Sequence, residues 1–175
     1  MSTSTTNPLY PRPTVQVITS EIVLPGNTNT HGTMFGGDVL ALMDKTAAIA
    51  AIRFCRQLVV TASTERIDFR TPIRLGDIIE AVAQVIHTGR TSLIVKIDIY
   101  AEQPLSGERQ RCTTGYYSFV SIDEQGKPRA VPPLKIETEA QRRDWERGEE
   151  IRQHIQQRRT AEREEIQLHG RRTPA

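Results

Sequence analysis

The stretch NTNTHGTMFGGDVLALMD, residues 27–44, decides the fold of this 175-residue chain. It places a polar, glycine-broken loop directly before a long apolar helix, which carries one acid, Asp44, about two turns inside its start. The paired glycines Gly36 and Gly37 leave backbone N–H groups uncovered at the helix entrance, so a carbonyl oxygen or an anion can approach them closely. We therefore expect a catalytic pocket at this entrance.

The helix is expected over residues 35–53, because apolar side chains recur there at helical spacing. The stripe consists of Leu40, Met43, Ala47 and Ala51, among further alanines. Small side chains keep the helix slim enough for a sheet to curl closely around it. We expect a buried helix.

Five segments predict strands: 14–24 before the helix, and 58–69, 77–87, 92–103 and 110–122 after it. In the strand at 92–103 apolar residues alternate with polar ones, which is typical of a sheet with one buried face. Short links that contain glycine favour antiparallel hairpins. The expected order is a strand, a long helix and a meander of four strands. This order favours an α+β fold, in which one helix packs on the concave face of one antiparallel sheet.

A sheet covered on one face by one helix keeps open edges. Such edges are commonly hidden by pairing with another copy of the chain. We therefore expect an obligate dimer at least.

Three regions are expected along the chain: a flexible N-terminus (1–13), the main domain (14–134) and a charged helical extension (135–175). Within the extension, residues 136–168 predict a charge-dense helix with a thin docking stripe of Trp145, Ile151 and Ile155. Its arginines alternate with glutamates, which favours a solvated helix laced with ion pairs over a nucleic-acid-binding one. Residues 171–175 are expected to fray.

Composition excludes several classes of protein. The formal charge of +2 does not indicate a nucleic-acid partner, and no apolar segment is long enough to span a membrane. The two cysteines, Cys55 and Cys112, have no metal-ligand spacing and are expected to be buried thiols in a reducing cytosol. The histidines likewise show no metal-ligand spacing, so we expect no metal, and a cytoplasmic location.

Asp44 and Asn29 are the leading catalytic candidates. An isolated aspartate in a helix usually faces solvent, but the apolar neighbours of Asp44 and the preceding loop point to a dry pocket. There a carboxylate can act as a general base on water or attack an acyl carbon directly. Asn29 can hold a water or a substrate carbonyl with its amide, although forming the turn is an equally good explanation for it.

Two further features of the loop have competing explanations. Gly36 and Gly37 can aim an N–H group at a developing oxyanion, or they can simply allow tight packing of the helix on the sheet. His31 ranks below Asp44, because no second acid–base candidate follows it and a histidine in a loop is often a polar surface residue.

Cations occur at two other places. Gly89-Arg90-Thr91-Ser92 falls at a turn between strands, where one cation, two hydroxyls and free N–H groups can converge on phosphate. Arg66 is a second cation, with pairing to Glu65 or Asp68 as its alternative role.

These segments together resemble the cytosolic acyl-CoA thioester hydrolases of the hotdog-fold superfamily. The resemblance covers about residues 15–134 and rests on residues 29–44, Glu65-Arg66-Ile67-Asp68-Phe69, Pro72, Leu75-Gly76-Asp77 and Gly89-Arg90-Thr91-Ser92. It implies a hotdog dimer, often assembled as a trimer of dimers, that hydrolyses acyl-CoA to free acid and CoA without a separate cofactor. The charged C-terminal helix also resembles extensions of that family.

The resemblance also implies roles for residues. Asn29 of one subunit and Asp44 of the other would act together, with an N–H near Gly36 and Gly37 polarising the thioester. CoA phosphates would bind around Arg90, Thr91 and Ser92, with Arg66 as a further cation.

Two rival functions remain open. Hotdog hydratases or dehydratases usually pair a histidine with a carboxylate, for which only His31 is available here. An acyl-CoA sensor would bind its ligand without turnover.

Overall fold

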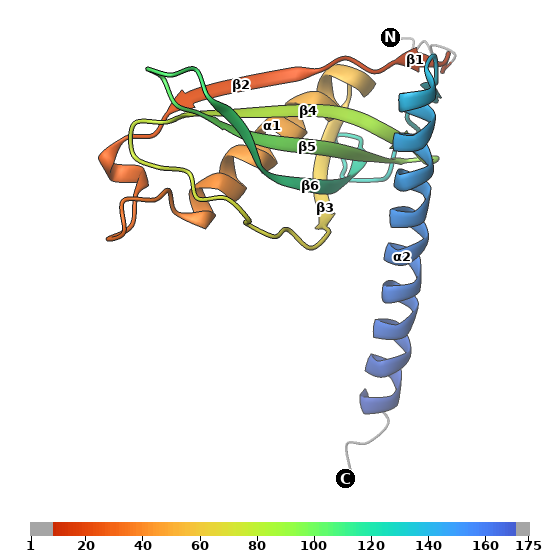
Figure 1. Ribbon diagram of the computed structural model, residues 1–175. Helices are drawn as coiled ribbons and strands as arrows, with labels where there is room; N and C mark the ends of the chain where they lie inside the picture. Colours follow the sequence, from red (N-terminus) through yellow and green to blue (C-terminus); the bar gives the residue numbers. More distant parts are fainter. Residues whose placement is uncertain (1–8, 171–175) are drawn as a thin grey trace.

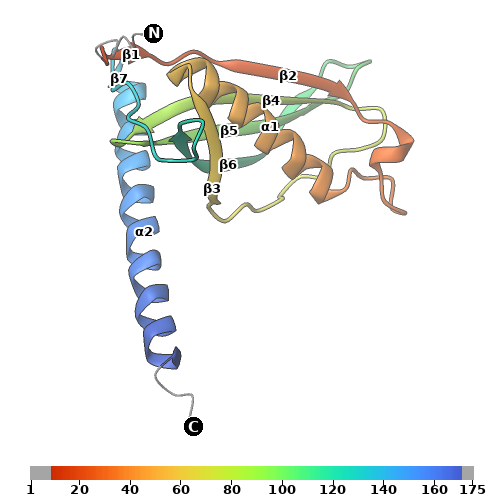
Figure 2. The ribbon, with the colours of Figure 1, turned by 180° about the vertical axis from the view of Figure 1, so that it is seen from behind.

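Helix α1 (Gly36–Cys55) lies against the concave face of a curled five-stranded antiparallel sheet (Figures 1 and 2). The structure, a computed structural model, describes residues 9–170, and the side chains of residues 9–166. The arrangement is the α+β architecture that the sequence predicts, a long helix wrapped by an antiparallel sheet. That part of the prediction is confirmed.

The buried face of α1 differs by one residue from the predicted stripe. Met43, Ala47 and Ala51 are fully buried, as expected, but Leu40 is 37% exposed. Val39 takes its place in the core, because the residues that meet the sheet recur at 39, 43, 46–47 and 50–51. On β6, Gly115 lets the sheet approach closely, since a Cβ there would lie 2.5 Å from Met43 Cε.

The sheet consists of β2 (Val17–Ile22), β4 (Ile78–Thr88), β5 (Ser92–Glu102), β6 (Arg109–Ile122) and β3 (Leu58–Thr64), in that spatial order. The predicted meander of four strands is therefore wrong in one respect. Only β4, β5 and β6 form a meander, while β3 pairs with β6 at the far edge. The long connection between β3 and β4 is the reason, because tight hairpins need loops of about two to five residues.

Strand boundaries also differ from the prediction. The strand expected over 58–69 ends at Thr64, and residues 65–70 continue beside β6 with only scattered bonds, such as Glu65 N–H to Tyr116 O at 3.0 Å. The strand expected over 14–24 is confined to β2, and a 3-10 turn, η1 (Pro25–Asn27), follows it.

At the N-terminal end, β1 (Arg12–Pro13) pairs in parallel with β7 (Leu134–Lys135). These residues of the expected flexible N-terminus are therefore held by the end of the main domain. Residues 1–8 and the expected frayed end, 171–175, lie outside the described residues. The boundaries of the three regions stay predictions.

Helix α2 (Glu139–Gly170) crosses the outer face of the sheet at the end formed by the β4–β5 hairpin, and its C-terminal part extends beyond the sheet (Figure 1). Ile151 and Ile155 are buried against Ile86 and Ile94, and the ring of Trp145 lies 5.1 Å from that of His87. The predicted docking stripe is confirmed. Ion pairs also run along the helix, with i,i+3 spacing where both partners belong to it.

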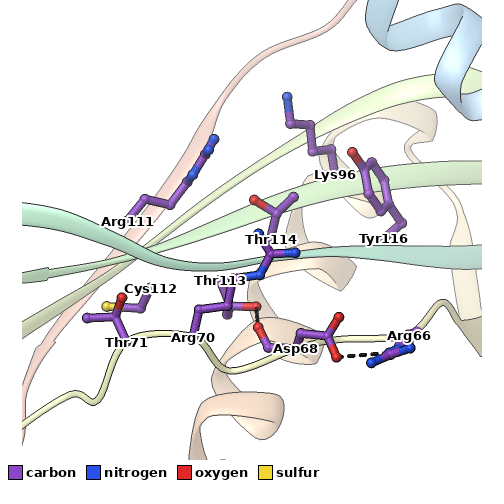
Figure 3. Close-up of a pocket in the computed structure, with 10 residues that line it drawn as sticks. All are labelled: Arg66, Asp68, Arg70, Thr71, Lys96, Arg111, Cys112, Thr113, Thr114 and Tyr116. Atoms are coloured by element: carbon purple, nitrogen blue, oxygen red, sulfur yellow. Dashed lines mark hydrogen bonds and ion pairs between the residues drawn. The ribbon is translucent and has the colours of Figure 1, made fainter.

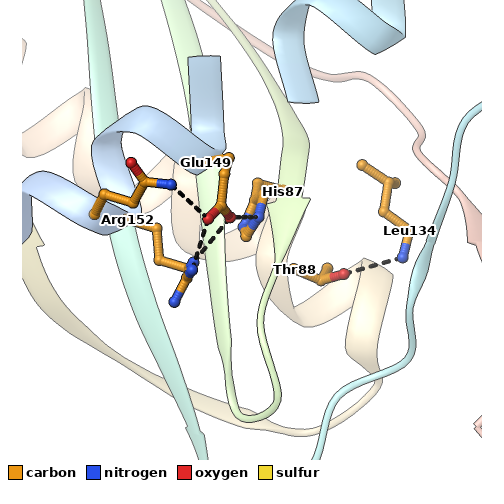
Figure 4. Close-up of polar contacts among 6 residues, drawn as sticks. His87, Thr88, Leu134, Glu149 and Arg152 are labelled. Carbon is orange, nitrogen blue, oxygen red and sulfur yellow. Dashed lines mark hydrogen bonds and ion pairs between the residues drawn. The ribbon is translucent and has the colours of Figure 1, made fainter. Parts of the chain in front are cut away.

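His87 anchors α2 to β4 (Figure 4). Its side chain is almost fully buried, and its Nε2 lies 2.9 Å from Glu149 Oε2. Glu149 in turn accepts hydrogen bonds from Arg152, so one carboxylate connects the sheet and the helix. Burial lowers the pKa of His87, against the opposing effect of the Glu149 charge.

Apolar side chains remain uncovered at the start of α1, along its exposed surface and on the edge strand β3. They are Phe35, Leu40, Ile49, Ile52, Leu58 and Val60. A row of exposed apolar residues beside an unpaired strand edge is the kind of surface that another chain covers.

Candidate active site

Backbone hydrogen bonds hold the loop before α1, both within the loop and to the segment before β4. Phe35 N–H donates to Asn27 O at 2.9 Å, and Met34 N–H donates to Ile73 O at 2.8 Å. Asn29 organises the loop from within: its Oδ1 accepts from the N–H of His31 at 2.9 Å, and its Nδ2 donates to Thr33 Oγ1 at 2.9 Å. Asn29 thus has the turn-forming role that was its alternative explanation, and the turn fixes the position of its amide.

The helix entrance offers free donors. Among the described residues, no hydrogen bond uses the N–H of Gly36 or Gly37, since the first bonded groups are those of Asp38 and Val39. Gly36 is also packed, because a Cβ there would lie 3.4 Å from the ring of Phe69. Gly37 has open space around its Cα. The packing explanation therefore holds for Gly36, and Gly37 carries the more accessible donor.

Asp44 is half-buried and has a partner that the sequence analysis missed. Thr61 Oγ1 donates to Asp44 Oδ1 at 2.9 Å, from the edge strand β3. The pairing register shifts between Thr61 and Ser63. Such a bulge re-aims side chains, and here it leaves Thr61 facing the helix. No sequence pattern marks Thr61, because it lies 17 residues after Asp44 and meets it only through the register of β3.

Tyr117 also belongs to the surroundings of Asp44. Burial raises the pKa of this phenol to about 12, and the negative charge of Asp44 adds to the effect. The phenol therefore stays neutral near the carboxylate at physiological pH. The sequence analysis did not single out Tyr117, which appeared there only as part of a strand.

Within one chain, the two leading candidates have separate partners. Among residues 9–170, no hydrogen bond joins Asn29 to Asp44. Asp44 comes seven residues after Gly37, a separation of about 10 Å along the helix axis. A carbonyl oxygen bound at the Gly37 N–H would therefore lie too far from the Asp44 carboxylate of the same chain for attack.

The remaining candidates lie elsewhere. His31 is exposed, and the structure connects it to Asn29 only through its backbone N–H. Arg66 is 85% exposed in its side chain and pairs with Asp68 at 2.9 Å, which was its alternative role.

Arg90, Thr91 and Ser92 form the tip of the β4–β5 hairpin, with Gly89 N–H donating to Ser92 O at 2.8 Å. Arg90 O accepts from Val131, a few residues before β7, and β7 pairs with β1. From β1, Arg12 donates to Phe54 O at the end of α1. The hairpin tip therefore lies at the C-terminal end of α1, about 30 Å from Gly36 and Gly37 in the same chain.

Both cysteines are buried and free, as expected, and burial raises the pKa of each thiol. Within the described part of the chain, no cluster of three or more histidine, cysteine or acidic residues could hold a metal ion. The helices there include none long and apolar enough to cross a bilayer.

Comparison with known proteins identifies relatives. Residues 31–108 match the family model of the Thioesterase superfamily. The chain is 37% identical over 124 residues to the uncharacterized acyl-CoA thioester hydrolase YkhA of Bacillus subtilis. The matched segment covers 71% of this chain and 72% of that protein.

Two solved structures have the same fold. An acyl-CoA hydrolase from Staphylococcus aureus, in complex with butyryl coenzyme A, coenzyme A and coenzyme A disulfide, gives a TM-score of 0.81 at 32% identity, over 89% of this chain and 94% of that chain. An apo-hexameric acyl-CoA thioesterase gives a TM-score of 0.78 at 38% identity, and the match covers 82% of this chain and 92% of that chain. Alanine variants of the Staphylococcus aureus enzyme, at one aspartate, one threonine and one asparagine, are also among the similar structures.

Proposed function

Because the chain belongs to the acyl-CoA thioester hydrolase family of the hotdog-fold thioesterase superfamily, we propose that it hydrolyses acyl-CoA thioesters to a free carboxylic acid and CoA. The proposal rests on two features of the structure: the Asp44 carboxylate held by Thr61, and a helix entrance with two unused N–H groups. Thioester hydrolysis needs a base or nucleophile, which the carboxylate supplies, and a site that stabilises the oxyanion, which the N–H groups supply.

Each active site combines two subunits in this proposal. Asn29 and the entrance glycines belong to one subunit, because the loop bonds hold Asn29 next to the start of α1. Asp44 comes from the other subunit, since the separation of about 10 Å along one helix is too large for attack. The exposed apolar side of α1 and the free edge of β3 supply the surface for such a pair.

The chemistry follows from these positions. The thioester carbonyl oxygen accepts from the Gly37 N–H, which stabilises the oxyanion as it develops. In one route, Asp44 takes a proton from a water oriented by Asn29; the water oxygen bonds to the acyl carbon, the carbon–sulfur bond breaks, and the proton passes to the CoA thiolate. In the other route, an Asp44 oxygen bonds to the acyl carbon and the carbon–sulfur bond breaks, which releases the CoA thiolate and leaves a mixed anhydride. Water then hydrolyses the anhydride to the free acid and the Asp44 carboxylate, and the proton that water releases passes to the thiolate.

The residue types in the solved relative support these assignments. The three alanine variants of the Staphylococcus aureus enzyme remove an aspartate, a threonine and an asparagine. Asp44, Thr61 and Asn29 are residues of the same three types, and two of them form a direct hydrogen bond here.

CoA binding is proposed at the hairpin tip of Arg90, Thr91 and Ser92. The cation of Arg90 and the two neighbouring hydroxyls would meet the CoA phosphates there.

Assembly and location are proposed from the relatives. A similar structure is hexameric, which supports a homo-oligomer here and, as the finer proposal, a trimer of dimers. The proposed partners are acyl-CoA and further copies of the chain. A cytoplasmic location stays a prediction.

The test is thiol release from a panel of short to long acyl-CoAs, followed with a chromogenic thiol reagent. The wild type should turn over at least part of the panel, and Asp44→Ala and Asn29→Ala should each lose at least about 100-fold in kcat. His31→Ala, in the same loop, is the control and should stay active. A folded wild type that binds acyl-CoA without thiol release would point to a sensor. Hydration of an enoyl-CoA without thiol release, lost in His31→Ala and kept in Asp44→Ala, would point to a hydratase.

A further inference from the structure

A buried phenol on the concave face of the sheet lies in the surroundings of the Asp44 carboxylate. Tyr117 of β6 is only 2% exposed, and its ring lies 6.5 Å from that of Phe119, two residues further along the same face. Among the described residues, Asp44 is the one charged group that shifts the pKa of this phenol. Tyr117 is therefore a core residue within the electrostatic reach of the candidate base.

The strand register places Tyr117 beside the contact that holds Asp44. Phe119 pairs with Thr61, and Tyr117 pairs with Thr64, so Tyr117 is a diagonal neighbour of Thr61. Thr61 donates the hydrogen bond to Asp44. Both threonines are exposed, because β3 is the edge strand. The concave face is therefore open to solvent next to the phenol and the carboxylate.

The hydroxyl of Tyr117 has no partner within the described part of the chain. Two side-chain oxygens there are closed off from solvent without a hydrogen bond, those of Thr14 and Ser63, and the Tyr117 oxygen is not one of them. It makes no hydrogen bond either, so the small exposed part of Tyr117 includes its hydroxyl. A buried tyrosine usually finds a partner for its O–H group. Here that partner has to come from the open side of the site.

A water molecule suits the position between the phenol and the carboxylate. The phenol keeps its proton at physiological pH and so acts as a donor, while the carboxylate acts as an acceptor. A water that accepts from Tyr117 on one lone pair and donates one hydrogen to Asp44 has its second lone pair left for attack. These two contacts fix the direction in which that lone pair points.

We propose that the Tyr117 O–H group donates a hydrogen bond to the hydrolytic water of the general-base route and so orients it for attack. This rests on the proposed function. In the step, Asp44 takes one proton of the water, and the water oxygen bonds to the acyl carbon. The carbon–sulfur bond then breaks, and the proton on Asp44 passes to the CoA thiolate. Tyr117 keeps its own proton throughout.

The experiment is thiol release by Tyr117→Phe with a short acyl-CoA, measured as a function of pH. The phenylalanine keeps the ring and removes the donor, so kcat should fall about tenfold or more while KM stays within about twofold. The acid limb of kcat/KM should also move to higher pH. A water that accepts from Tyr117 donates more strongly to the carboxylate and favours its ionised form, and this effect is lost in the variant.

Tyr116→Phe is the matched control, because it removes the same atom from the next residue on the opposite face of the sheet. Tyr116 packs on the cluster that docks α2 and lines an outer pocket with Arg70, Lys96 and Arg111 (Figure 3). It should leave kcat and the pH profile unchanged. Urea unfolding followed by tryptophan fluorescence checks the fold. Tyr117→Phe should be about as stable as the wild type, since the deleted hydroxyl has no partner within residues 9–166.

Full kcat in Tyr117→Phe overturns the proposal, as does an equal loss in Tyr116→Phe. A raised KM with unchanged kcat would place the hydroxyl on the substrate instead, and a lower kcat with an unmoved acid limb would reduce Tyr117 to a packing role; either result contradicts the proposal. Absence of thiol release from the wild type defeats the proposed function and this proposal together. Wild-type turnover with an unaffected Tyr117→Phe contradicts this proposal alone.

Discussion

At the scale of single residues, the hydrogen bond between Thr61 and Asp44 is the contact with the sharpest consequence. A carboxylate that must reach water or an acyl carbon needs a fixed orientation, and a misplacement of about 1 Å can cost about 100-fold in rate. Thr61 Oγ1 supplies that orientation from a second element, at 2.9 Å. Thr61 is thus a positioning residue in the proposed mechanism.

Thr61→Val should therefore lower kcat about 10- to 100-fold with little change in KM, because the valine keeps the shape but removes the donor. Steady-state thiol release with a short acyl-CoA measures this. Thr61→Ser restores the hydroxyl and should recover most of the lost rate. Full kcat in Thr61→Val would remove the hydroxyl from the mechanism.

Gly148 sets how closely α2 approaches the sheet. A Cβ there would lie 2.4 Å from His87 Cβ, which is not the end of a flexible side chain. Gly148→Ala gains about 1 kcal/mol of helix propensity but forces α2 away from β4, which costs about 1–3 kcal/mol. We expect net destabilisation in urea unfolding followed by Trp145 fluorescence. Glu146→Ala, at an exposed site nearby, should be close to neutral, and a more stable Gly148→Ala would contradict the close packing.

At the scale of elements, the docking of α2 should depend on pH through His87. Burial lowers its pKa from the usual value of about 6.5, so the folded state favours the neutral ring. The resulting stabilisation is fully present above the unfolded pKa and is lost as pH falls through the lower folded pKa. Glu149, with its pKa lowered to about 2 chiefly by the Arg152 hydrogen bond, stays ionised throughout this range.

We expect Trp145 fluorescence and the thermal midpoint to change as pH falls from 7 to 5 in the wild type. His87→Gln removes the titrating ring and should flatten this change. An identical pH profile in His87→Gln would assign it to other groups.

At the scale of the whole molecule, a site shared between subunits makes a quantitative prediction. A mixed dimer of one Asp44→Ala and one Asn29→Ala chain contains one intact site and one doubly altered site. After subunit exchange between two inactive variants, activity should recover to about one quarter of the wild type, because half the dimers are mixed and each has one working site. Thiol release before and after exchange measures this. No recovery despite exchange, shown by mass spectrometry of tagged chains, would place both residues within one subunit.

The edge strand β3 tests the proposed interface. Val60 is 45% exposed on this strand, and Val60→Lys puts a charge on the unpaired edge, which opposes pairing with another copy. Light scattering should show a smaller particle with lower thiol release. Leu105→Lys, at a loop residue that is 98% exposed, is the control and should leave both unchanged. An unchanged mass for Val60→Lys would move the interface elsewhere.

Much of the fold could be predicted from local patterns. The core alternation of β5, the helix around Met43 and the docking stripe of Ile151 and Ile155 follow from periodicity, and the structure confirms them. Two features of β3 were missed: its position at the edge of the sheet beside β6, and its end at Thr64. Periodicity carries no information about which strands become neighbours.

The sequence by itself therefore determined the elements, the class of fold and the candidates Asp44, Asn29 and the entrance glycines, since helix entrances and buried faces are encoded by neighbouring residues. Only the tertiary structure decided that Thr61 contacts Asp44, that Asp44 lies about 10 Å along α1 from the entrance glycines, and that Arg70, Lys96 and Arg111 line one pocket. These facts depend on strand register, on a bulge and on the 10 Å rise of a helix over about seven residues. Contacts between distant segments are fixed by packing in three dimensions, which no local pattern contains.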